Sequence, residues 1–310
     1  MKAIQYTAFG DSSVIQLSQV SKPTPQDKEV LIRVTAVTVN PLDIKIRSGF
    51  MQKQMPLVLP YIPGLDVSGI VEAVGSDVIR LKAGDEVFGT TFGGTFAEYV
   101  SINEDQLATI PNNVNKNEAA ALAVPLVTAY TFLVEEGRLQ AGQKVLIQGA
   151  AGAVGSTMVQ MAKEMGAYVI GTASGEGIAL LESFRTDQVI DYKTQDFTQV
   201  VKDVDLVLDL VGGEIQAKSF EVLKKGGLLL STVMPPSAEL AQKFGVNARF
   251  ANSSPSYKKL EFGKRLVEQG KIKAQIARIL SLADAAQAQD LVTGGGINGK
   301  VVLETNTFSE

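Results

Sequence analysis

The order of apolar and polar residues divides the chain into two parts with different patterns. Up to about residue 110, alternating and β-branched segments separated by Gly and Pro predict short strands. We expect these strands at residues 29–40, 69–75, 85–91 and 95–102. No long helix is predicted among them.

From residue 117 onward, helical and strand-like segments alternate. Residues 117–136 predict a helix that is capped by Asn117 and kinked or broken at Pro125. We expect strands at 144–149, 167–173, 188–192, 204–211, 227–233 and 299–304, and helices at 156–165, 178–184, 196–201 and 215–223. This alternation is typical of βαβ units and predicts an α/β fold with a doubly wound parallel sheet.

A glycine-rich turn, QGAAGAVG at 148–155, connects a predicted strand to a predicted helix. Compared with the GxGxxG turn, Gly152 and Gly155 keep the second and third glycines, and Ala150 stands at the first. The helix would direct its N-terminal N–H groups at a diphosphate. We predict that this turn binds a dinucleotide through Ala150, Gly152, Ala153, Val154 and Gly155. The alternative is that these small residues only pack a strand against a helix.

The residue after the second strand of this region bears on the choice of cofactor. An NAD-type fold usually carries Asp or Glu there to hold the ribose 2′-OH, whereas this chain has Ser174. Without a carboxylate to repel a 2′-phosphate, NADP(H) is favoured. Two alternatives stay open: Glu176 takes the acid's place, or Ser174 only starts a turn and either cofactor is accepted. Tyr192 would pack near the adenosine or cap the sheet.

Two further turns are predicted at the carboxyl ends of the strands, where open α/β sheets bind ligands. The first follows the fourth strand and contains Val211, Gly212 and Gly213. The second ends the fifth strand with Ser231, Thr232 and Val233. We expect both to flank the nicotinamide end of the cofactor. The alternative is that Gly212 and Gly213 form only a turn that contacts no ligand.

Composition narrows the chemistry and the partners. The 310 residues contain no Cys and no His, which excludes a thiolate nucleophile and an imidazole base and argues against a zinc site. The net charge is −4, with no block of Lys and Arg, so nucleic acid is not expected as a partner. No signal-like segment opens the chain and no apolar run has membrane-spanning length. We expect a cytoplasmic protein without a membrane partner.

Seven stretches together resemble the zinc-free quinone oxidoreductase branch of the medium-chain dehydrogenase/reductase superfamily. They are residues 39–49, 62–78, 81–89, 93–100, 120–133, 145–167 and 299–303. The resemblance implies a GroES-like, partly open β-barrel at 1–118, a Rossmann doubly wound parallel sheet at 119–258, and a return of 259–310 to the first domain.

The resemblance also implies an enzyme that reduces quinones or α,β-unsaturated carbonyl compounds with NADPH and without a metal. Zinc-dependent members have Cys where this chain has Asn40, and Gly-His-Glu where it has Gly64-Leu65-Asp66. Quinones and conjugated carbonyl compounds are already electrophilic, so their reduction does not need zinc as a Lewis acid.

By resemblance, Asn40 and Asp43 are expected at the active-site mouth, with Asn40 donating a hydrogen bond to the acceptor carbonyl. The alternative is turn chemistry, in which Asp43 caps a helical turn containing Arg47. Asp66 would bond backbone N–H groups or pair with Arg47.

Three more residues are expected at the cofactor by resemblance. Thr128 would touch the nicotinamide ribose or carboxamide, unless it only bonds its own helix backbone. Asn298 and Lys300 belong to a matching C-terminal segment, and Lys300 would reach a phosphate or ribose, or be solvated. The proton donor is not identified, because Tyr61 and Tyr257 qualify by residue type only.

Other functions stay open. Enoyl-thioester reduction would require a basic surface, but the helical spacing of Lys258, Lys259, Lys264 and Arg265 predicts a solvated helix face. A zinc-free alcohol dehydrogenase would lack an obvious base. A non-enzymatic protein that binds NADPH with little turnover is a third alternative. Family members commonly dimerise through the edge of the Rossmann sheet, which predicts a homodimer through a strand at 242–254.

Overall fold

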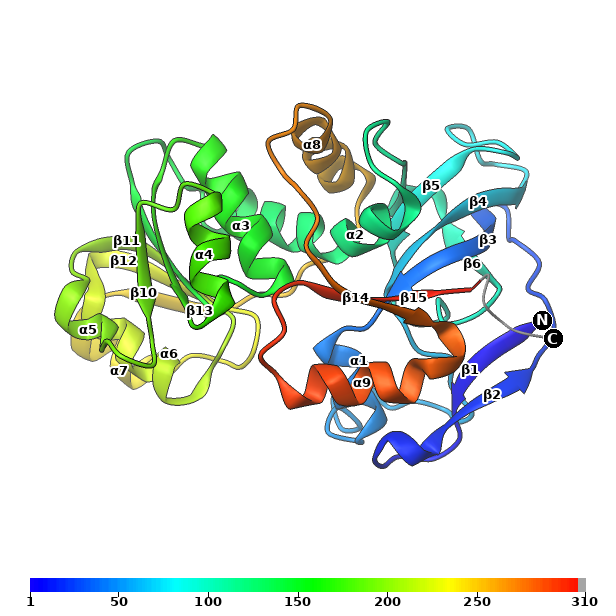
Figure 1. Ribbon diagram of the computed structural model, residues 1–310, viewed down its shortest axis with the longest axis horizontal. Helices are drawn as coiled ribbons and strands as arrows, with labels where there is room; N and C mark the ends of the chain where they lie inside the picture. The colour runs from blue at the N-terminus through cyan, green and yellow to red at the C-terminus, as the bar shows by residue number, and fades with distance from the viewer. Residues whose placement is uncertain (306–310) are drawn as a thin grey trace. The chain divides into compact units, whose positions relative to one another are not determined.

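Packing divides the chain into two compact units. The computed structural model describes residues 1–305 (Figure 1). Of these residues, the first unit comprises 1–124, 255–268 and 274–305, and the second comprises 125–254 and 269–273. The second unit therefore includes a short segment, 269–273, that the sequence placed with the C-terminal return.

The first unit is built around a seven-stranded sheet with β3 (Glu29–Thr38) at its centre. The strand order is β14-β15-β3-β4-β5-β7, and β6 also pairs with β3. The other strands of this unit are β1 (Lys2–Tyr6), β2 (Ile15–Gln19), β4 (Asp66–Val74), β5 (Glu86–Thr90), β6 (Tyr99–Asn103), β7 (Leu107–Thr109), β14 (Ile276–Ser281) and β15 (Lys300–Glu304). Apolar side chains of β3, β4 and β15 contribute to the core of this unit, together with residues of β1, β5, β6 and β7.

Antiparallel pairing of β15 with β3 joins the two ends of the chain. Val302 stands opposite Thr38, and the amide of Val39 donates to the carbonyl of Val301 at 3.0 Å. Asp66 stands opposite Thr38 on the other side of β3. The helices of this unit are α1 (Pro41–Arg47), α8 (Tyr257–Glu268) and α9 (Ala285–Gly294), and α1 lies beside α9 (Figure 1).

Helix α2 (Lys116–Tyr130) is the helix predicted over 117–136, with a different cap. Asn115 Oδ1 accepts from the amide of Glu118, and the Glu118 carboxylate accepts from the amide of Asn115 at 2.8 Å, which forms a capping box. The prediction of Asn117 as the cap is therefore wrong. Pro125 lies inside the helix and does not end it, and a π-helical segment, Thr131–Glu136, extends it.

The helix from Lys116 to Glu136 is long and apolar enough to cross a membrane by length and composition. The prediction that no segment has this length therefore needs correction. However, 78% of its most apolar window is buried inside the protein. This burial is what a core helix shows, and the segment gives only weak support for a membrane span.

The second unit contains a six-stranded parallel sheet in the order β10-β9-β8-β11-β12-β13. Numbered along the chain from β8, this is the 3-2-1-4-5-6 order of the Rossmann fold. The strands are β8 (Lys144–Gln148), β9 (Tyr168–Ala173), β10 (Gln188–Asp191), β11 (Val204–Asp209), β12 (Leu223–Ser231) and β13 (Asn247–Phe250). The predicted doubly wound parallel sheet is confirmed.

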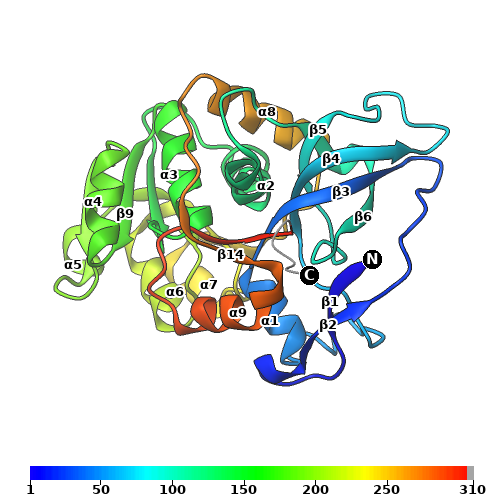
Figure 2. The same cartoon turned by 45° about the vertical axis from the view of Figure 1, so that its right-hand side comes forward.

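Helices cover both faces of this sheet. Figure 2 shows α3 (Ala153–Glu164) and α4 (Glu176–Ser183) on one face, and α6 (Gly213–Ser219) and α7 (Ala238–Phe244) on the other. A short helix, α5 (Phe197–Val200), contributes Phe197 to an apolar cluster with the α6 and α7 side. Helix α3 begins three residues before the predicted start, because Gly152 serves as its N-cap.

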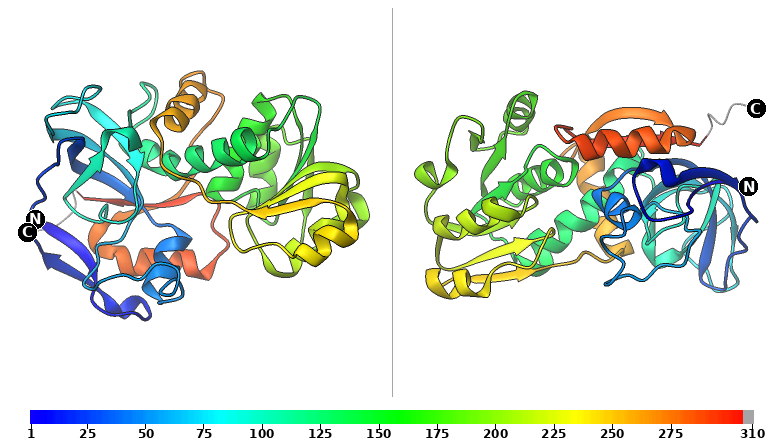
Figure 3. Two further views of the ribbon diagram at one scale, coloured as in Figure 1. Left: turned by 180° about the vertical axis from the view of Figure 1, so that it is seen from behind. Right: turned by 90° about the horizontal axis from the view of Figure 1, so that it is seen from below.

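The edge strand β13 is shorter than the segment predicted for dimerisation. Helix α7 extends to Phe244, and Gly245 ends it with a left-handed φ of 65°. Only Asn247–Phe250 then pairs with β12. The two strands, β12 and β13, are yellow in Figure 3, and β13 is the edge strand of the sheet. The homodimer through this edge stays a prediction.

Candidate functional site

Four polar side chains meet where β3, β4 and β15 pair. The Lys300 ammonium lies 2.8 Å from Asp66 Oδ2 and donates to Asn40 Oδ1 at 2.5 Å. Thr38 Oγ1 also donates to Asp66 Oδ2. All four side chains are buried, with relative exposures of 5% or less. The strand register explains the cluster, because it places the ends of three strands together.

The Asn40 amide is held on both sides. Its oxygen accepts from Lys300, while Nδ2 donates to Asp66 Oδ2 at 2.8 Å and to the Thr38 carbonyl at 3.3 Å. A bond from Asn40 to an acceptor carbonyl would therefore have to replace one of these two bonds. The alternative of a solvated Lys300 is wrong, and the contact of Lys300 with a phosphate or ribose stays a prediction.

Asp66 connects this cluster to helix α2. Its Oδ1 accepts from the amide of Val124 at 2.6 Å, so the predicted bond to a backbone N–H is confirmed. Pairing with Arg47 is wrong, since Arg47 Nη1 donates instead to Gln289 Oε1 at 2.7 Å.

Asp43 lies in a capping box at the start of α1. Its carboxylate accepts from the amides of Asn40 at 2.8 Å and Gly64 at 3.1 Å. The expected capping role is confirmed. Burial raises the pKa of Asp43 to about 7, against the lowering effect of these amide bonds and of Lys300. A catalytic role for Asp43 stays a prediction.

A second buried network was not anticipated from the sequence. Tyr6 Oη donates to the carbonyl of Asp43 at 3.2 Å and accepts from Gln289 Nε2 at 2.6 Å. Through Gln289 it reaches Arg47 and so links β1, α1 and α9. No local pattern pointed to it, because Tyr6 and Gln289 are separated by 283 positions.

The two tyrosines considered as proton donors have different surroundings. Burial, with a contribution from Asp43, raises the pKa of Tyr61 to about 12. Its Oη packs on Gly93, where an added Cβ would lie 2.2 Å away. The Tyr257 ring lies 3.9 Å from the Arg80 guanidinium carbon and is partly exposed. Burial therefore makes the Tyr61 phenol a weaker acid.

The glycine turn of the second unit has the geometry of a phosphate-binding turn. Gly149 has a φ of 72°, and Gly152 caps α3 without any side-chain hydrogen bond to the helix N-terminus. A Cβ at Gly155 would lie 2.4 Å from the Gly149 carbonyl, so only glycine allows this close packing. At Gly152 the nearest atom would be 3.5 Å away, which leaves space beside the backbone. These features fit a dinucleotide diphosphate.

Ser174 and Tyr192 are brought together at the ends of two adjacent strands. Ser174 follows β9, Tyr192 follows β10, and Ser174 Oγ donates to Tyr192 Oη at 2.8 Å. Tyr192 is exposed and Ser174 is half-buried. Glu176 is exposed at the start of α4 and does not stand at the end of β9.

The turns after β11 and β12 are joined by a residue that the sequence reasoning missed. Asp209, the last residue of β11, accepts from the amides of Val211 at 3.1 Å and Gly212 at 2.8 Å. It also accepts from Ser231 Oγ at 2.8 Å. An acidic residue two positions before Val-Gly-Gly, at a strand end, was the available signal.

Thr128 and Asn298 lie in different environments. Thr128 Oγ1 lies 3.1 Å from Ser253 Oγ, so the alternative in which it bonds only its own helix backbone is wrong. Asn298 is half-buried in the segment that precedes β15. Their contacts with a cofactor stay predictions.

The basic residues of α8 do not form one solvated face. Lys259 is buried, and Lys264 Nζ donates to Thr109 Oγ1 at 2.5 Å. The prediction of a fully solvated face is therefore wrong. Because these two cations are engaged in the first unit, they also do not provide the basic surface that a phosphopantetheine group would need.

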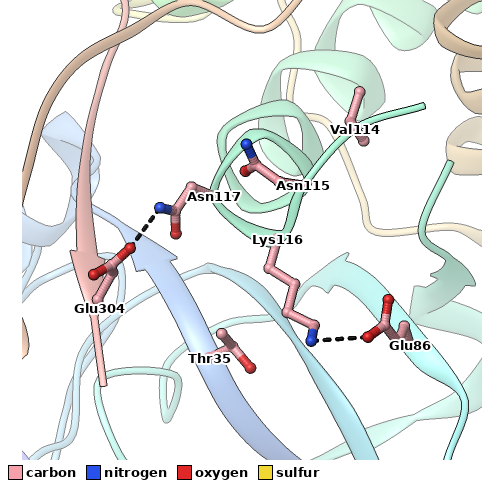
Figure 4. A pocket seen from close by; sticks show the side chains of 7 residues that line it. All are labelled: Thr35, Glu86, Val114, Asn115, Lys116, Asn117 and Glu304. Atoms are coloured by element: carbon pink, nitrogen blue, oxygen red, sulfur yellow. Dashed lines mark hydrogen bonds and ion pairs between the residues drawn. The ribbon is translucent and has the colours of Figure 1, made fainter. Parts of the chain in front are cut away.

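A polar pocket of about 360 Å³ lies at the start of α2 (Figure 4). Lys116 Nζ lies 2.8 Å from Glu86 Oε1, and Asn117 Nδ2 donates to Glu304 Oε1 at 2.6 Å. Since its charged groups are bonded to neighbours within the pocket, we do not assign it to the reaction.

Two family models match the chain. Residues 26–112 match the alcohol dehydrogenase GroES-like domain, and residues 185–303 match a model described as zinc-binding dehydrogenase. The residues present do not fit zinc, because the chain has no Cys or His. Asn40 Oδ1 and Asp66 Oδ2 are bonded to the Lys300 ammonium, and residues 1–305 contain no cluster of three metal-ligating side chains.

Full-length relatives give a more specific comparison. The chain is 33% identical to a quinone oxidoreductase of Mus musculus, covering 98% of this chain and 97% of the relative. It is 36% identical to a 2-methylene-furan-3-one reductase of Solanum lycopersicum, covering 98% and 79%. The structure of Escherichia coli quinone oxidoreductase complexed with NADPH superimposes with a TM-score of 0.90 at 25% identity, covering 98% and 100%. The chain therefore belongs to the quinone oxidoreductase branch of the medium-chain dehydrogenase/reductase superfamily and is an oxidoreductase of that type.

Proposed function

We propose that the protein is a metal-free reductase that uses NADPH to reduce quinones or α,β-unsaturated carbonyl compounds. The observation that carries the cofactor choice is at the ends of β9 and β10, where the hydroxyl groups of Ser174 and Tyr192 stand in place of a carboxylate. The Escherichia coli relative was crystallised with NADPH, which supports the same choice.

Most of the residues that would hold the cofactor lie in the second unit, whereas Asn298 and Lys300 belong to the first. The N–H groups at the start of α3 would bind the diphosphate, since no side chain caps them. The hydroxyls of Ser174 and Tyr192 would donate to the 2′-phosphate. The turns after β11 and β12, containing Gly212 and Thr232, would flank the nicotinamide end. NADPH supplies a hydride when it is bound.

The acceptor class rests on the relatives and on the first unit's polar cluster. The relatives are named for quinones and for a furanone with a conjugated methylene group. Such acceptors are already electrophilic and need polarisation rather than a metal. Asn40 is our candidate for this polarisation. The Lys300 ammonium on Asn40 Oδ1 draws electron density from the amide, which makes the amide N–H groups stronger donors.

The first test is a calorimetric titration of the purified protein with NADPH and with NADH. We expect clearly tighter binding of NADPH. Steady-state oxidation of NADPH should then be measured with a quinone, an enone and a saturated ketone as matched control. Turnover with the first two but not the third supports the acceptor class. Binding without turnover would favour a non-enzymatic NADPH-binding protein, and absence of binding would refute the proposal.

A further inference from the structure

Asp209 is a fully buried carboxylate at the carboxyl end of β11, with a relative exposure of 0%. A buried carboxylate is costly unless several donors satisfy its oxygens. The donors of Asp209 come from two different turns of the second unit. This arrangement makes a single side chain responsible for the shape of both.

One oxygen of Asp209 holds the turn after β11. Oδ1 accepts from the amides of Val211 at 3.1 Å and Gly212 at 2.8 Å. Gly212 and Gly213 have φ values of 81° and 57°, which only glycine adopts without strain. Two glycines leave the turn conformationally free, so the carboxylate is needed to select one conformation.

The other oxygen of Asp209 holds the turn after β12. Oδ2 accepts from Ser231 Oγ at 2.8 Å, and Ser231 Oγ in turn accepts from the amide of Val233 at 3.1 Å. Oδ2 also accepts from Gln216 Nε2 at 2.9 Å, and this amide bonds the carbonyl of Met234 at 3.2 Å. The second turn is thus fixed through two intermediaries.

The turn after β11 borders the glycine turn after β8. A Cβ added at Gly149 would lie 3.2 Å from Val211 Cγ2. Strands β8 and β11 are neighbours at the point where the strand order reverses, which is where open α/β sheets bind ligands. Asp209 therefore shapes the backbone next to the diphosphate turn without being exposed to it.

We infer that Asp209 is a positioning residue for the cofactor, which holds the turns at 211–213 and 231–234 in the conformation that receives the nicotinamide half. This inference rests on the proposed use of NADPH. Bonds from donors to a carboxylate are stronger than those between neutral groups, so their loss should loosen both turns.

The test compares Asp209→Asn with Asp205→Asn. Asparagine is nearly isosteric, but its NH₂ group cannot accept from both Ser231 and Gln216. Asp205 is the matched control, because it lies on the same strand near its other end and accepts from the amide of Lys144 at 2.8 Å. In Asp209→Asn without cofactor, the amides of residues 211, 212 and 233 should exchange hydrogen faster. NADPH affinity should fall roughly tenfold or more.

The KM for NADPH should rise with this loss of affinity, whereas the KM for the acceptor should not. Asp205→Asn should leave amide exchange at these turns and NADPH affinity as in the wild type. Unchanged exchange in Asp209→Asn would overturn the role in holding the turns. Faster exchange with unchanged NADPH affinity would overturn the role in cofactor positioning.

If Asp209→Asn does not fold, Gln216→Met serves as the second variant, because it removes only the bonds to Asp209 Oδ2 and the Met234 carbonyl. It should loosen residues 233–234 and weaken NADPH binding to a smaller extent. Unchanged exchange and affinity in this variant would also overturn the inference. Failure of the wild-type protein to bind NADPH would instead refute the proposed function, while amide exchange still decides whether Asp209 holds the turns.

Discussion

The Lys300 ammonium lies 2.8 Å from the Asp66 carboxylate, and these two buried residues are 234 positions apart in the chain. Asp66 begins β4 and Lys300 begins β15, so the pair joins strands on opposite sides of β3. Removal of one partner would leave the other charge buried without compensation.

For this reason Lys300→Met should lower the free energy of unfolding by about 3–5 kcal/mol. Chemical denaturation followed by circular dichroism would measure it. Lys22→Met is the control, because the Lys22–Glu72 ion pair is about 40% exposed and its loss should leave the midpoint nearly unchanged. A similar midpoint for Lys300→Met and wild type would contradict the importance of the buried pair.

Asp43 should give the stability an unusual dependence on pH. Its pKa rises from 3.8 to about 7 on folding, so the folded state binds the proton more tightly. Stability should therefore fall as the pH rises from about 4 to about 7, by an amount on the order of 4 kcal/mol from this group, and then stay level. Urea unfolding of the wild type and Asp43→Asn across this range would measure the difference.

In Asp43→Asn this contribution should disappear. Asp11→Asn is the control, because hydrogen bonds from Ser13 lower the pKa of Asp11 at an exposed position. The stability of Asp11→Asn should still fall as the pH rises from about 4 to about 7, because Asp43 is unchanged in this variant. The same slope in Asp43→Asn and in the wild type would show that another group titrates in this window.

Ser174→Asp should shift the cofactor preference from NADPH towards NADH. A carboxylate at the end of β9 would repel the 2′-phosphate and accept from the ribose 2′-OH. We expect NADPH to bind roughly tenfold or more weakly, measured by calorimetry, with NADH binding unchanged or tighter. Glu176→Gln tests the competing acid and should leave both affinities unchanged. A loss of NADH binding in Glu176→Gln would mean that Glu176, not Ser174, faces the ribose.

Alanine substitutions at the two glycines of the phosphate turn should have different effects, one on stability and the other on NADPH binding. A Cβ at Gly155 would lie 2.4 Å from the Gly149 carbonyl and 2.7 Å from Ala150 Cα, both rigid backbone atoms. Gly155→Ala should therefore lower the thermal midpoint. Gly152→Ala meets nothing closer than 3.5 Å, so it should keep the midpoint and weaken NADPH binding. Scanning calorimetry and cofactor titration on both variants would check this. Equal midpoints for the two variants would contradict the packing argument.

Metal chelation should not affect turnover. Asn40 Oδ1 and Asp66 Oδ2 are bonded to Lys300, Asp66 Oδ1 accepts from the Val124 amide, and the chain has no Cys or His. NADPH oxidation should be the same before and after treatment with a chelator, and added Zn²⁺ should not raise it. Activity that is abolished by the chelator and restored by Zn²⁺ would contradict a metal-free site.

The sequence by itself was sufficient where the signal was local. The alternation of strands and helices predicted the parallel sheet, because periods of 2 and 3.6 are set within ten or so residues. The glycine turn was recognisable because its three motif positions, Ala150, Gly152 and Gly155, lie within one short segment. Even so, local signals misplaced element ends, as with Asn115 in place of Asn117 at the cap of α2.

Tertiary structure decided which polar side chains satisfy one another. The bonds of Lys300 to Asn40 and Asp66 depend on the antiparallel register of β15 with β3, which no residue near Lys300 encodes. Asp209 likewise meets Ser231 only because β11 and β12 are adjacent in the sheet. Burial then fixes these contacts, because a charge removed from water must find its partner wherever the fold places one.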